Sequence, residues 1–560
     1  MLQKMELTQQ EKDKLEINPN FDFREIASRE FDQITKNEIG MFKWSGIYHQ
    51  LQKGYFMMRL RCPGGIFNAA QLKRAGEMAI QYAQNEICLS TRQCVQFHWL
   101  RKEDLYKVIE GMEETGITIT NACGDVVRNV CSCPGMGVCP YEEADSRAML
   151  TRIANDPEFL ETKRNLPRKH KIAVSGCNSA CGMQLLNCQS WVPSKHPETG
   201  ELGWTYYAGG GLGRNPYMAK KIYDWVPEDL VTAITRAGVE AHNRHGDRRQ
   251  RRYARLKIVV DRFGQKGYAE EILNILRETG VEAADTVIIA EDEHPKVKPI
   301  PFAGQAVVPE KTPGLNTVRV IIKRSEISGD EAIRFAEWAE EYGNGEIMFT
   351  PRQNLELRGV SDANLPKLKE LLLTNSYRLE GLEHLPDVVA CVGTTMCNLA
   401  VSDTPNAYRR IMAEFADDED YWREIGPLRV NMNGCPNNCA HAWIADIGLR
   451  GRRLNLPSGG SEEGFTIFVG GHMDDAGNIG EDLIDSSTEN ITSSMRAVLD
   501  VYLENRTSKD ELFKNFVKRI DLEEFRRLTV EKLDLAKKEP VNKLNMSLYD
   551  LFDKVVEEAK

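Results

Sequence analysis

The chain has 560 residues, 41% of them hydrophobic, which is enough for several cores and predicts about two to four domains. Its formal net charge of −11 argues against a nucleic-acid partner and against binding to a membrane surface, because both need an excess of positive charge. The polar N-terminal residues hold no apolar signal segment, and no apolar run of about 18 residues follows them, so we expect a cytoplasmic protein.

Along the chain, short apolar or alternating runs predict strands, and apolar residues spaced three or four apart predict helices between them. The expected strands are 55–62, 94–100, 171–177, 318–324, 354–360 and 428–435. The expected helices are 69–84, 103–114, 267–280, 330–343 and 365–374. A Pro-rich stretch at 294–314 predicts a connection between two halves, and the charged segments after 505 predict a solvated packing helix. The alternation indicates α+β or α/β layers in each half.

Eight of the fourteen cysteines form two sets with the same spacing. In each set C-x5-C is followed, after 37 residues, by C-x3-C, and each cysteine of the second set lies 258 residues after its counterpart. The sets are Cys133, Cys139, Cys177 and Cys181, then Cys391, Cys397, Cys435 and Cys439. A shared register over four positions indicates an internal duplication.

Other blocks repeat with a displacement of 260 residues. STRQCVQFHWL at 90–100 matches TPRQNLELRGV at 350–360, and Arg59 matches Arg319. The two halves therefore extend over about 40–260 and about 310–500.

Thiolates in groups of four bind zinc or an iron–sulfur cluster. Structural zinc sites typically use C-x2–4-C pairs, so the C-x5-C spacing favours an iron–sulfur cluster. The remaining alternative, eight inert core cysteines, fits poorly with two sets in one register.

The sequences CVGTTMC and NGCPNNC, at 391–397 and 433–439, resemble the cysteine signature of the sirohaem-dependent sulfite and nitrite reductases. Further blocks resemble this family in the same order: GYFMMRLRCPGG, STRQCVQFHW, DVVRNV, LPRKHK and GGGLG. The resemblance implies an α+β fold with pseudo-twofold duplication, mixed sheets and covering helices. It implies an N-terminal arm (1–40), a first ferredoxin-like repeat (41–125), a first sirohaem/Fe–S-type domain (126–260), a connection (261–314), a second ferredoxin-like repeat (315–385), a second sirohaem/[4Fe–4S] domain (386–505) and a helical tail (506–560).

The resemblance also assigns the cofactors. Cys391, Cys397, Cys435 and Cys439 are expected to hold a [4Fe–4S] cluster, and Cys439 also to ligate the iron of sirohaem. The first half departs from the relatives because its set is complete. Cys133, Cys139, Cys177 and Cys181 therefore predict a possible second [4Fe–4S] cluster, with accidental retention as packing residues as the alternative.

By the same resemblance, Arg59, Arg128, Lys169 and Lys171 bind the substrate anion. Lys169 and Lys171 alternate along an expected strand, so their side chains should share one face. Few of these residues are duplicated: the counterpart of Arg128 falls on Val or Ala in PDVVAC, Lys169 matches Pro427, and Lys171 matches Arg429. Arg92, Gln96 and His98 are expected to contact sirohaem, with Gln353 and Asn354 as candidates from the second half.

The expected reaction is the six-electron reduction of sulfite to sulfide, with electrons from an external donor such as ferredoxin. Lysine at both 169 and 171 favours sulfite, which is largely dianionic near neutral pH. Nitrite reduction to ammonia is the alternative, a precorrin-modifying oxygenase is a more distant one, and a nonenzymatic zinc or nucleic-acid module is a distant fourth. The basic run 242–257 is either a solvated helix or a docking patch for an acidic ferredoxin.

Overall fold

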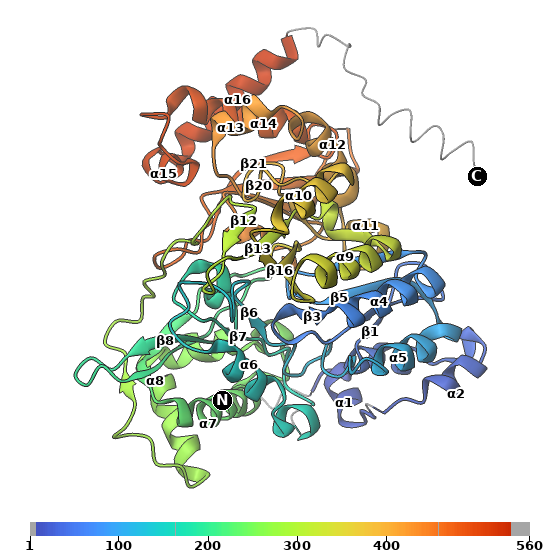
Figure 1. The fold of residues 1–560 in the computed structure, drawn as a ribbon, viewed down its shortest axis with the longest axis vertical. Helices are drawn as coiled ribbons and strands as arrows, with labels where there is room; N and C mark the ends of the chain where they lie inside the picture. Colours follow the sequence, from blue (N-terminus) through green and yellow to red (C-terminus); the bar gives the residue numbers. More distant parts are fainter. Residues whose placement is uncertain (1–6, 19, 163, 457, 539–560) are drawn as a thin grey trace.

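The structure, a computed structural model, describes residues 7–18, 20–162, 164–456 and 458–538 (Figure 1). It begins with three short helices, α1 (Gln9–Leu15), α2 (Phe23–Ser28) and α3 (Lys36–Met41). No helix in the described ranges has the length and apolar character needed to cross a membrane.

Each half begins with one antiparallel sheet of five strands. Each sheet takes its edge strand from the other half: β14 pairs with β4, and β3 pairs with β15. The first sheet contains β1 (Ile47–His49), β2 (Tyr55–Arg59), β5 (Val95–Arg101), β4 (Glu86–Leu89) and β14 (Glu326–Ser328). The second contains β12 (Val307–Pro309), β13 (Leu315–Val320), β16 (Leu355–Ser361), β15 (Glu346–Phe349) and β3 (Ile66–Asn68).

Helices cover these two sheets and pack against each other across the duplication. They are α4 (Ala69–Tyr82), α5 (Leu105–Glu113), α9 (Gly329–Tyr342) and α10 (Leu365–Thr374). Helices α4 and α9 lie side by side in Figure 1, and a Cβ at Gly76 would come within 2.5 Å of the Gly329 carbonyl oxygen. The two glycines therefore allow the backbones to approach, and the halves share one core.

Two mixed sheets carry the cysteines, and each contains three neighbouring parallel strands followed by antiparallel ones. The first contains β6 (Cys131–Ser132), β7 (Ile172–Val174), β8 (Gln189–Lys195), β9 (Leu202–Ala208), β10 (Lys220–Val226) and β11 (Ile288–Ile289). The second contains β17 (Val389–Ala390), β18 (Val430–Asn433), β19 (Ile447–Asn455), β20 (Ser461–Val469) and β21 (Glu481–Ser487). The carboxyl ends of parallel strands meet at one edge, which brings the two cysteine pairs of each set together.

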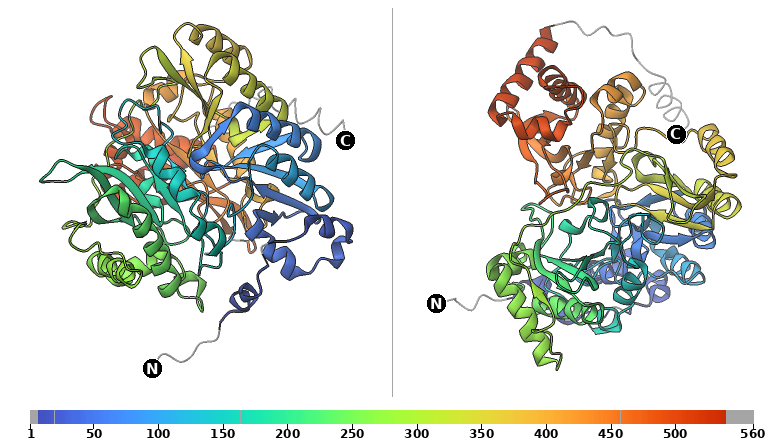
Figure 2. Two further views of the ribbon diagram at one scale, coloured as in Figure 1. Left: turned by 60° about the horizontal axis from the view of Figure 1, so that its bottom comes forward. Right: turned by 60° about the vertical axis from the view of Figure 1, so that its left-hand side comes forward.

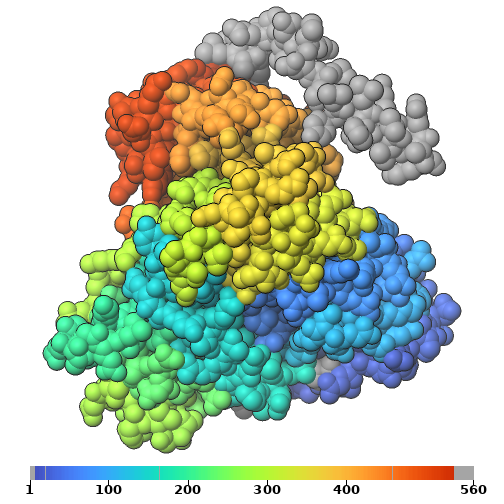
Figure 3. Space-filling view, in the orientation of Figure 1, coloured from blue at the N-terminus to red at the C-terminus, as the bar shows by residue number. Residues whose placement is uncertain are grey.

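The remaining helices cover these mixed sheets. They are α6 (Ser146–Ala154), α7 (Glu228–His245), α8 (Leu256–Glu278), α11 (Gly393–Met396), α12 (Thr404–Phe415), α13 (Glu419–Ile425), α14 (Ile491–Asn505), α15 (Phe513–Arg519) and α16 (Leu522–Lys538). Figure 2 shows α7 and α8 at one end of the molecule and α14–α16 at the other, and Figure 3 shows the residues near 350 between them.

The structure confirms that each expected strand and helix exists, but several bounds differ. The strand expected at 55–62 ends at Arg59, the strand expected at 318–324 is Leu315–Val320, and the helix expected at 267–280 is part of the longer Leu256–Glu278. Two further differences have a clear structural basis. The strand expected at 171–177 extends only over Ile172–Val174, because the chain turns there into the loop that carries Cys177. The tail expected to be a solvated packing helix forms two helices, and its Phe513, Phe516 and Phe525 are fully buried in the core of the second mixed sheet.

The N-terminal helix α1 is fixed by a buried ionic network around Asp125. Its carboxylate lies 2.9 Å from Arg168, 3.2 Å from Arg251 and 3.4 Å from Lys14 of α1. Burial alone would raise the pKa of Asp125, but these three cations outweigh burial and hold it well below its usual range. The stability that this carboxylate contributes is therefore present above its unfolded pKa of about 3.9 and is lost as the pH falls.

We expect Asp125→Asn to lower the free energy of unfolding by about 3 kcal/mol, because it leaves the buried Lys14 and its neighbouring arginines without this partner. Denaturant unfolding at neutral pH measures the loss. Asp32→Asn removes an exposed carboxylate, paired at 2.9 Å with Lys53, and is expected to change the stability by less than about 0.5 kcal/mol. Equal effects of the two substitutions would contradict a stabilising role for the network.

Candidate active site and cysteine clusters

The second-half thiols gather where β17 and β18 end. Cys391 and Cys397 flank the short helix α11, and the Gly434 N–H donates a hydrogen bond to the Cys391 Sγ at 3.1 Å. Burial, and after it the charge of Cys439, raises the pKa of Cys391 to about 12, so these two thiols are near each other. Cys439 is exposed, and the Thr91 hydroxyl of the first half donates to its carbonyl at 2.7 Å.

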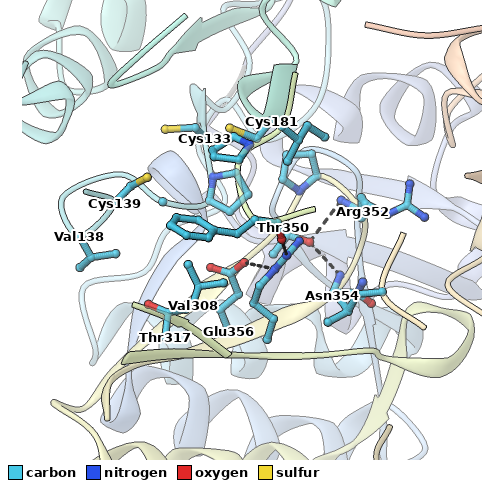
Figure 4. A pocket seen from close by; sticks show the side chains of 18 of the residues that line it. Cys133, Val138, Cys139, Cys181, Val308, Thr317, Thr350, Arg352, Asn354 and Glu356 are labelled. Atoms are coloured by element: carbon cyan, nitrogen blue, oxygen red, sulfur yellow. Dashed lines mark hydrogen bonds and ion pairs between the residues drawn. The ribbon is translucent and has the colours of Figure 1, made fainter. Parts of the chain in front are cut away.

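The first-half thiols have the same arrangement. The Gly176 N–H donates to the Cys133 Sγ at 3.5 Å, the counterpart of the Gly434 bond. A hydrogen bond to Cys133 and burial raise the pKa of Cys181 well above its ordinary value, and Cys177 and Cys139 raise it further. All four thiols line a cavity of about 1020 Å³ that opens to solvent, and Figure 4 shows three of them.

The separation of the sulfurs bears on the choice between zinc and a cluster. A tetrahedral zinc ion with Zn–S bonds of about 2.3 Å holds its thiolates about 3.8 Å apart. Within the described ranges, no three of these eight thiols lie within 4.8 Å of one another. A [4Fe–4S] cluster separates its four thiolates more widely than a single ion does, so the spacing of the thiols is compatible with a cluster.

Cations gather beside Cys439 without acidic partners. Arg59, at the end of β2, donates to the Gln96 amide oxygen at 2.9 Å, and Arg128 donates to the Gly124 carbonyl at 2.6 Å. Among the described residues, no carboxylate forms an ion pair with Arg59, Arg128, Lys169 or Lys171. Arg128 is buried and the other three are half-buried, and positive charge withdrawn from water in this way is costly unless an anion neutralises it.

The two lysines lie on either side of His170, in the extended segment before β7. Burial lowers the pKa of Lys171 to about 7, with Arg92 and Arg255 adding to the effect. Burial lowers the pKa of Lys169 well below its ordinary value, and Arg168, Lys171, Arg255 and Arg128 lower it further. Arg92 and Lys171 line one small cavity together with Thr91, whose hydroxyl donates to the Cys439 carbonyl, so this cavity lies beside Cys439. The charge of Cys439 also acts on the pKa of Lys171 and of Arg59, in the direction opposite to burial.

The expected cofactor contacts divide into two groups. Arg92 donates to Asn187 at 3.0 Å, and its buried Nε has no hydrogen-bond partner in the part of the chain that the structure describes. Both ring nitrogens of buried His98 lack partners among the same residues, and burial, then Arg59, lowers its pKa to about 3. Gln96 contacts Arg59, as described above. Arg92, Gln96 and His98 therefore lie near the cation pocket.

Gln353 and Asn354 lie elsewhere. Gln353 donates to the Leu89 carbonyl at 2.9 Å, and its counterpart Gln93 donates to the Phe349 carbonyl at 3.0 Å, so the pair joins the two halves reciprocally. Asn354 lines the cavity of the first-half thiols (Figure 4). The contact expected between these two residues and sirohaem stays a prediction.

The basic run 242–257 was expected to be either a solvated helix or a docking patch for ferredoxin. Neither role describes the whole run, because several of its basic side chains have partners inside the protein. Arg251 is paired internally with Glu11 and Asp125, and Lys257 donates to the Gly211 carbonyl at 3.2 Å. Arg255 reaches the cation pocket, and its buried Nε has no partner among the described residues. A Cβ at Gly211 would come within 2.5 Å of the Arg255 guanidinium, which explains why glycine stands there in GGGLG.

Sequence reasoning missed Arg255, Tyr48 and Cys123. The Tyr48 hydroxyl lies 3.5 Å from Arg128, and the charges of Cys123 and Tyr48 act on the pKa of Arg59, so all three lie in or beside the cation pocket. The density of the basic run was a signal for Arg255. Tyr48 and Cys123 carry no local signal, because only the folded chain brings them to the pocket.

The chain matches known proteins over most of its length. The family model described as "Nitrite and sulphite reductase 4Fe-4S domain" matches residues 123–278 and 383–537, and "Nitrite/Sulfite reductase ferredoxin-like half domain" matches 48–115 and 308–375. Sulfite reductase [ferredoxin] of Mycobacterium tuberculosis is 31% identical, over 80% of this chain and 82% of the relative. The assimilatory ferredoxin-dependent nitrite reductase of Haloferax mediterranei is 30% identical, over 80% of each chain. The solved structure of the Mycobacterium tuberculosis NirA protein has a TM-score of 0.82 at 29% identity, over 93% of this chain and 97% of that one.

Proposed function

Because the chain belongs to the nitrite and sulphite reductase family, and is thus an oxidoreductase with a duplicated α+β fold, we propose that it reduces sulfite to sulfide with sirohaem and a [4Fe–4S] cluster. The observation that carries this proposal is the group of buried and half-buried cations near Cys439 that have no carboxylate partner among the described residues. A small dianion is the kind of ligand that such a pocket requires.

The residues present fit both cofactors. Sirohaem carries several carboxylates, and the unpartnered Nε atoms of Arg92 and Arg255 are buried donors that suit them. Cys391, Cys397, Cys435 and Cys439 would hold the cluster, and Cys439, whose charge acts on Arg59 and Lys171, would also ligate the haem iron. When bound, these groups supply an iron that reduces the anion and a store for incoming electrons.

The chain's own residues bind the anion and deliver protons. Arg59 and Arg128 donate charge-assisted hydrogen bonds to the sulfite oxygens and are held in place by neutral partners. Removal of each oxygen as water consumes two protons, which the ammonium groups of Lys169 and Lys171 can supply from Nζ. The Tyr48 hydroxyl beside Arg128 is a further donor at the same site. Burial of these groups keeps bulk water from competing for the anion.

The electron donor that we propose is an external ferredoxin. The names of the sulfite and nitrite reductases from Mycobacterium tuberculosis and Haloferax mediterranei support this donor. Such a donor delivers electrons one at a time, whereas the reaction needs six, so the cations of the site would have to keep the partly reduced anion bound until the last step.

Nitrite is the second candidate substrate. The 30% identity to the Haloferax nitrite reductase supports this candidate. Two lysines at 169 and 171 favour sulfite, because the second positive charge suits a dianion. A precorrin-modifying oxygenase is the more distant alternative, and the complete set of Arg59, Arg128, Lys169 and Lys171 supports a reductase instead. Steady-state kinetics of the purified protein with both anions and reduced ferredoxin tests the proposal, and turnover of neither anion would overturn it.

We further propose that Cys133, Cys139, Cys177 and Cys181 hold a second [4Fe–4S] cluster. Their arrangement repeats that of the second set, including the glycine N–H that donates to the first thiol. Met183 and Pro351 line both this cavity and a smaller one that contains Arg92 and Lys171. A cluster here would therefore lie close to the proposed haem pocket and could relay electrons to it.

We expect Lys171→Asn to lower kcat/KM for sulfite at least about tenfold more than kcat/KM for nitrite. Loss of one charged hydrogen bond costs about 1.5–3 kcal/mol, and the dianion depends on it more than the monoanion does. Lys367→Asn, on exposed α10, removes a charge remote from the pocket and serves as the control. Equal losses for the two anions would show that substrate choice is set elsewhere.

A further inference from the structure

We call the smaller cavity, which contains Arg92 and Lys171, the first cavity, and the cavity lined by the first-half thiols the second cavity. Three cations in or near the first cavity have cationic counterparts that line the second. Arg59, Arg92 and Lys171 correspond to Arg319, Arg352 and Arg429. The strand register confirms the first pair, because Arg59 lies opposite Gln96 and Arg319 lies opposite Glu356. In all three pairs, the cation of the second cavity contacts a carboxylate, whereas a residue without a carboxylate stands at the equivalent position of the first cavity.

The first difference is at Gln96 and Glu356. Arg59 donates to the neutral Gln96 amide oxygen at 2.9 Å. Arg319 lies 3.4 Å from the Glu356 carboxylate and 3.2 Å from that of Glu383, and it also donates to the Phe302 carbonyl at 3.1 Å. The charge of Arg319 is therefore neutralised inside the protein, whereas that of Arg59 is not.

The second difference is at Asn129 and Asp387. Arg92 donates to the backbone carbonyl of Asn129, and Arg352 donates to the backbone carbonyl of Asp387, so the two arginines share one geometry. The Asp387 carboxylate also accepts from the Arg352 Nε at 2.7 Å. Asn129 offers no carboxylate, and the Arg92 Nε has no partner among the residues the structure describes. Its hydrogen bond remains available to a ligand.

The third difference is at Cys188 and Asp446. Cys188 lies among the cations of the first cavity, since the Arg255 guanidinium donates to its Sγ at 3.7 Å. Its counterpart Asp446 pairs with Arg429 at 3.4 Å. Each cation retained in the second cavity thus has a carboxylate partner whose counterpart in the first cavity is an amide or a thiol.

We propose that Gln96, Asn129 and Cys188 determine which of the two cavities binds anions, by leaving Arg59, Arg92 and Lys171 uncompensated. Glu356, Asp387 and Asp446 exclude anions from the equivalent cavity, because an incoming anion would have to displace a carboxylate already in contact with each arginine. Figure 4 shows Arg352, Asn354 and Glu356 on the wall opposite the first-half thiols. The inference rests on the proposed function, since it names the residues that keep its anion site open.

Gln96→Glu tests the proposal by adding one carboxylate with almost no change of shape. We expect the dissociation constant for sulfite, followed by the visible spectrum of the bound haem, to rise about 10- to 100-fold, the value of one charged hydrogen bond. Carbon monoxide, an uncharged ligand of reduced haem, should bind as in the wild type. The matched control is Glu356→Gln, the reciprocal change in the other cavity, which should leave sulfite affinity unchanged.

Three outcomes would overturn the inference. Sulfite affinity of Gln96→Glu within about twofold of wild type would do so, as would an equal loss for carbon monoxide, which would indicate distortion rather than charge. If Gln96→Glu does not fold, Asn129→Asp decides: loss of bound sirohaem from a chain with normal thermal unfolding supports the proposal, and full sirohaem content and sulfite affinity overturn it. A wild-type protein without sirohaem overturns the proposed function and this inference together. If the wild type contains sirohaem and binds sulfite, and the variant binds sulfite equally well, only the inference is overturned.

Discussion

Replacing Cys439 with serine is expected to remove the visible bands of sirohaem and to abolish reduction of sulfite and nitrite, a loss of at least about a thousandfold in turnover. The physical reason is that this thiol is proposed to serve two metal groups, so its loss removes a ligand from both at once. Its charge acts on both Arg59 and Lys171, and it is the exposed member of the set, so no buried neighbour can replace it. Absorption spectra and iron analysis of the purified variant measure the loss.

The control is Cys88→Ser, in β4. Cys88 is buried against Glu86 and Glu326 and is remote from both sets in the sequence, so its loss should leave the spectrum and the iron content unchanged. Full sirohaem occupancy with normal turnover in Cys439→Ser would overturn the assignment of the shared ligand. Loss of the bands in both variants would show only that the chain tolerates serine poorly at buried or ligating thiols.

Local pattern predicted much of the fold. The strands at Tyr55–Arg59 and Val95–Arg101 and the helix at Ala69–Tyr82 carry their own periodicity, so neighbouring residues alone define them. The exchanged strands β3 and β14 were not predicted, because three residues are too few for a periodic signal. Their partners lie in the other half, and no local pattern encodes that pairing.

For the candidate site too, the sequence predicted some features and not others. The cysteine register predicted which thiols gather, because a repeat in the sequence is a repeat in the fold. It did not predict that Arg319 is neutralised by Glu356 and Glu383 while Arg59 contacts an amide, since an arginine looks alike in sequence whether or not a carboxylate faces it. The contact expected between Gln353 and the cofactor stays a prediction. A motif match fixes a position in the chain and not the direction of a side chain, and what the structure adds is the hydrogen bond from Gln353 to the Leu89 carbonyl of the other half.

The four first-half thiols are expected to contribute as much cluster iron as the second set. If both clusters are present, iron and acid-labile sulfide should each approach about eight per chain, apart from the haem iron. In Cys177→Ser/Cys181→Ser about half of this iron should be lost while sirohaem is retained, because the two cavities have separate ligands and Cys439 is untouched. Cys177 is buried and Cys181 half-buried against Cys133, so serine at both positions is a small change of volume.

The same double substitution distinguishes a cluster from packing thiols. If these thiols only packed, removing two sulfurs would leave the iron content near four in both proteins, and only a modest loss of stability would follow. If the cluster also relays electrons past Met183 and Pro351 to the proposed haem pocket, turnover with reduced ferredoxin should fall in the variant more than turnover with dithionite, a small reductant that does not need this cluster as a relay. A wild-type iron content near four, apart from the haem iron, would overturn the second cluster. Equal losses with the two donors would keep the cluster and overturn the relay.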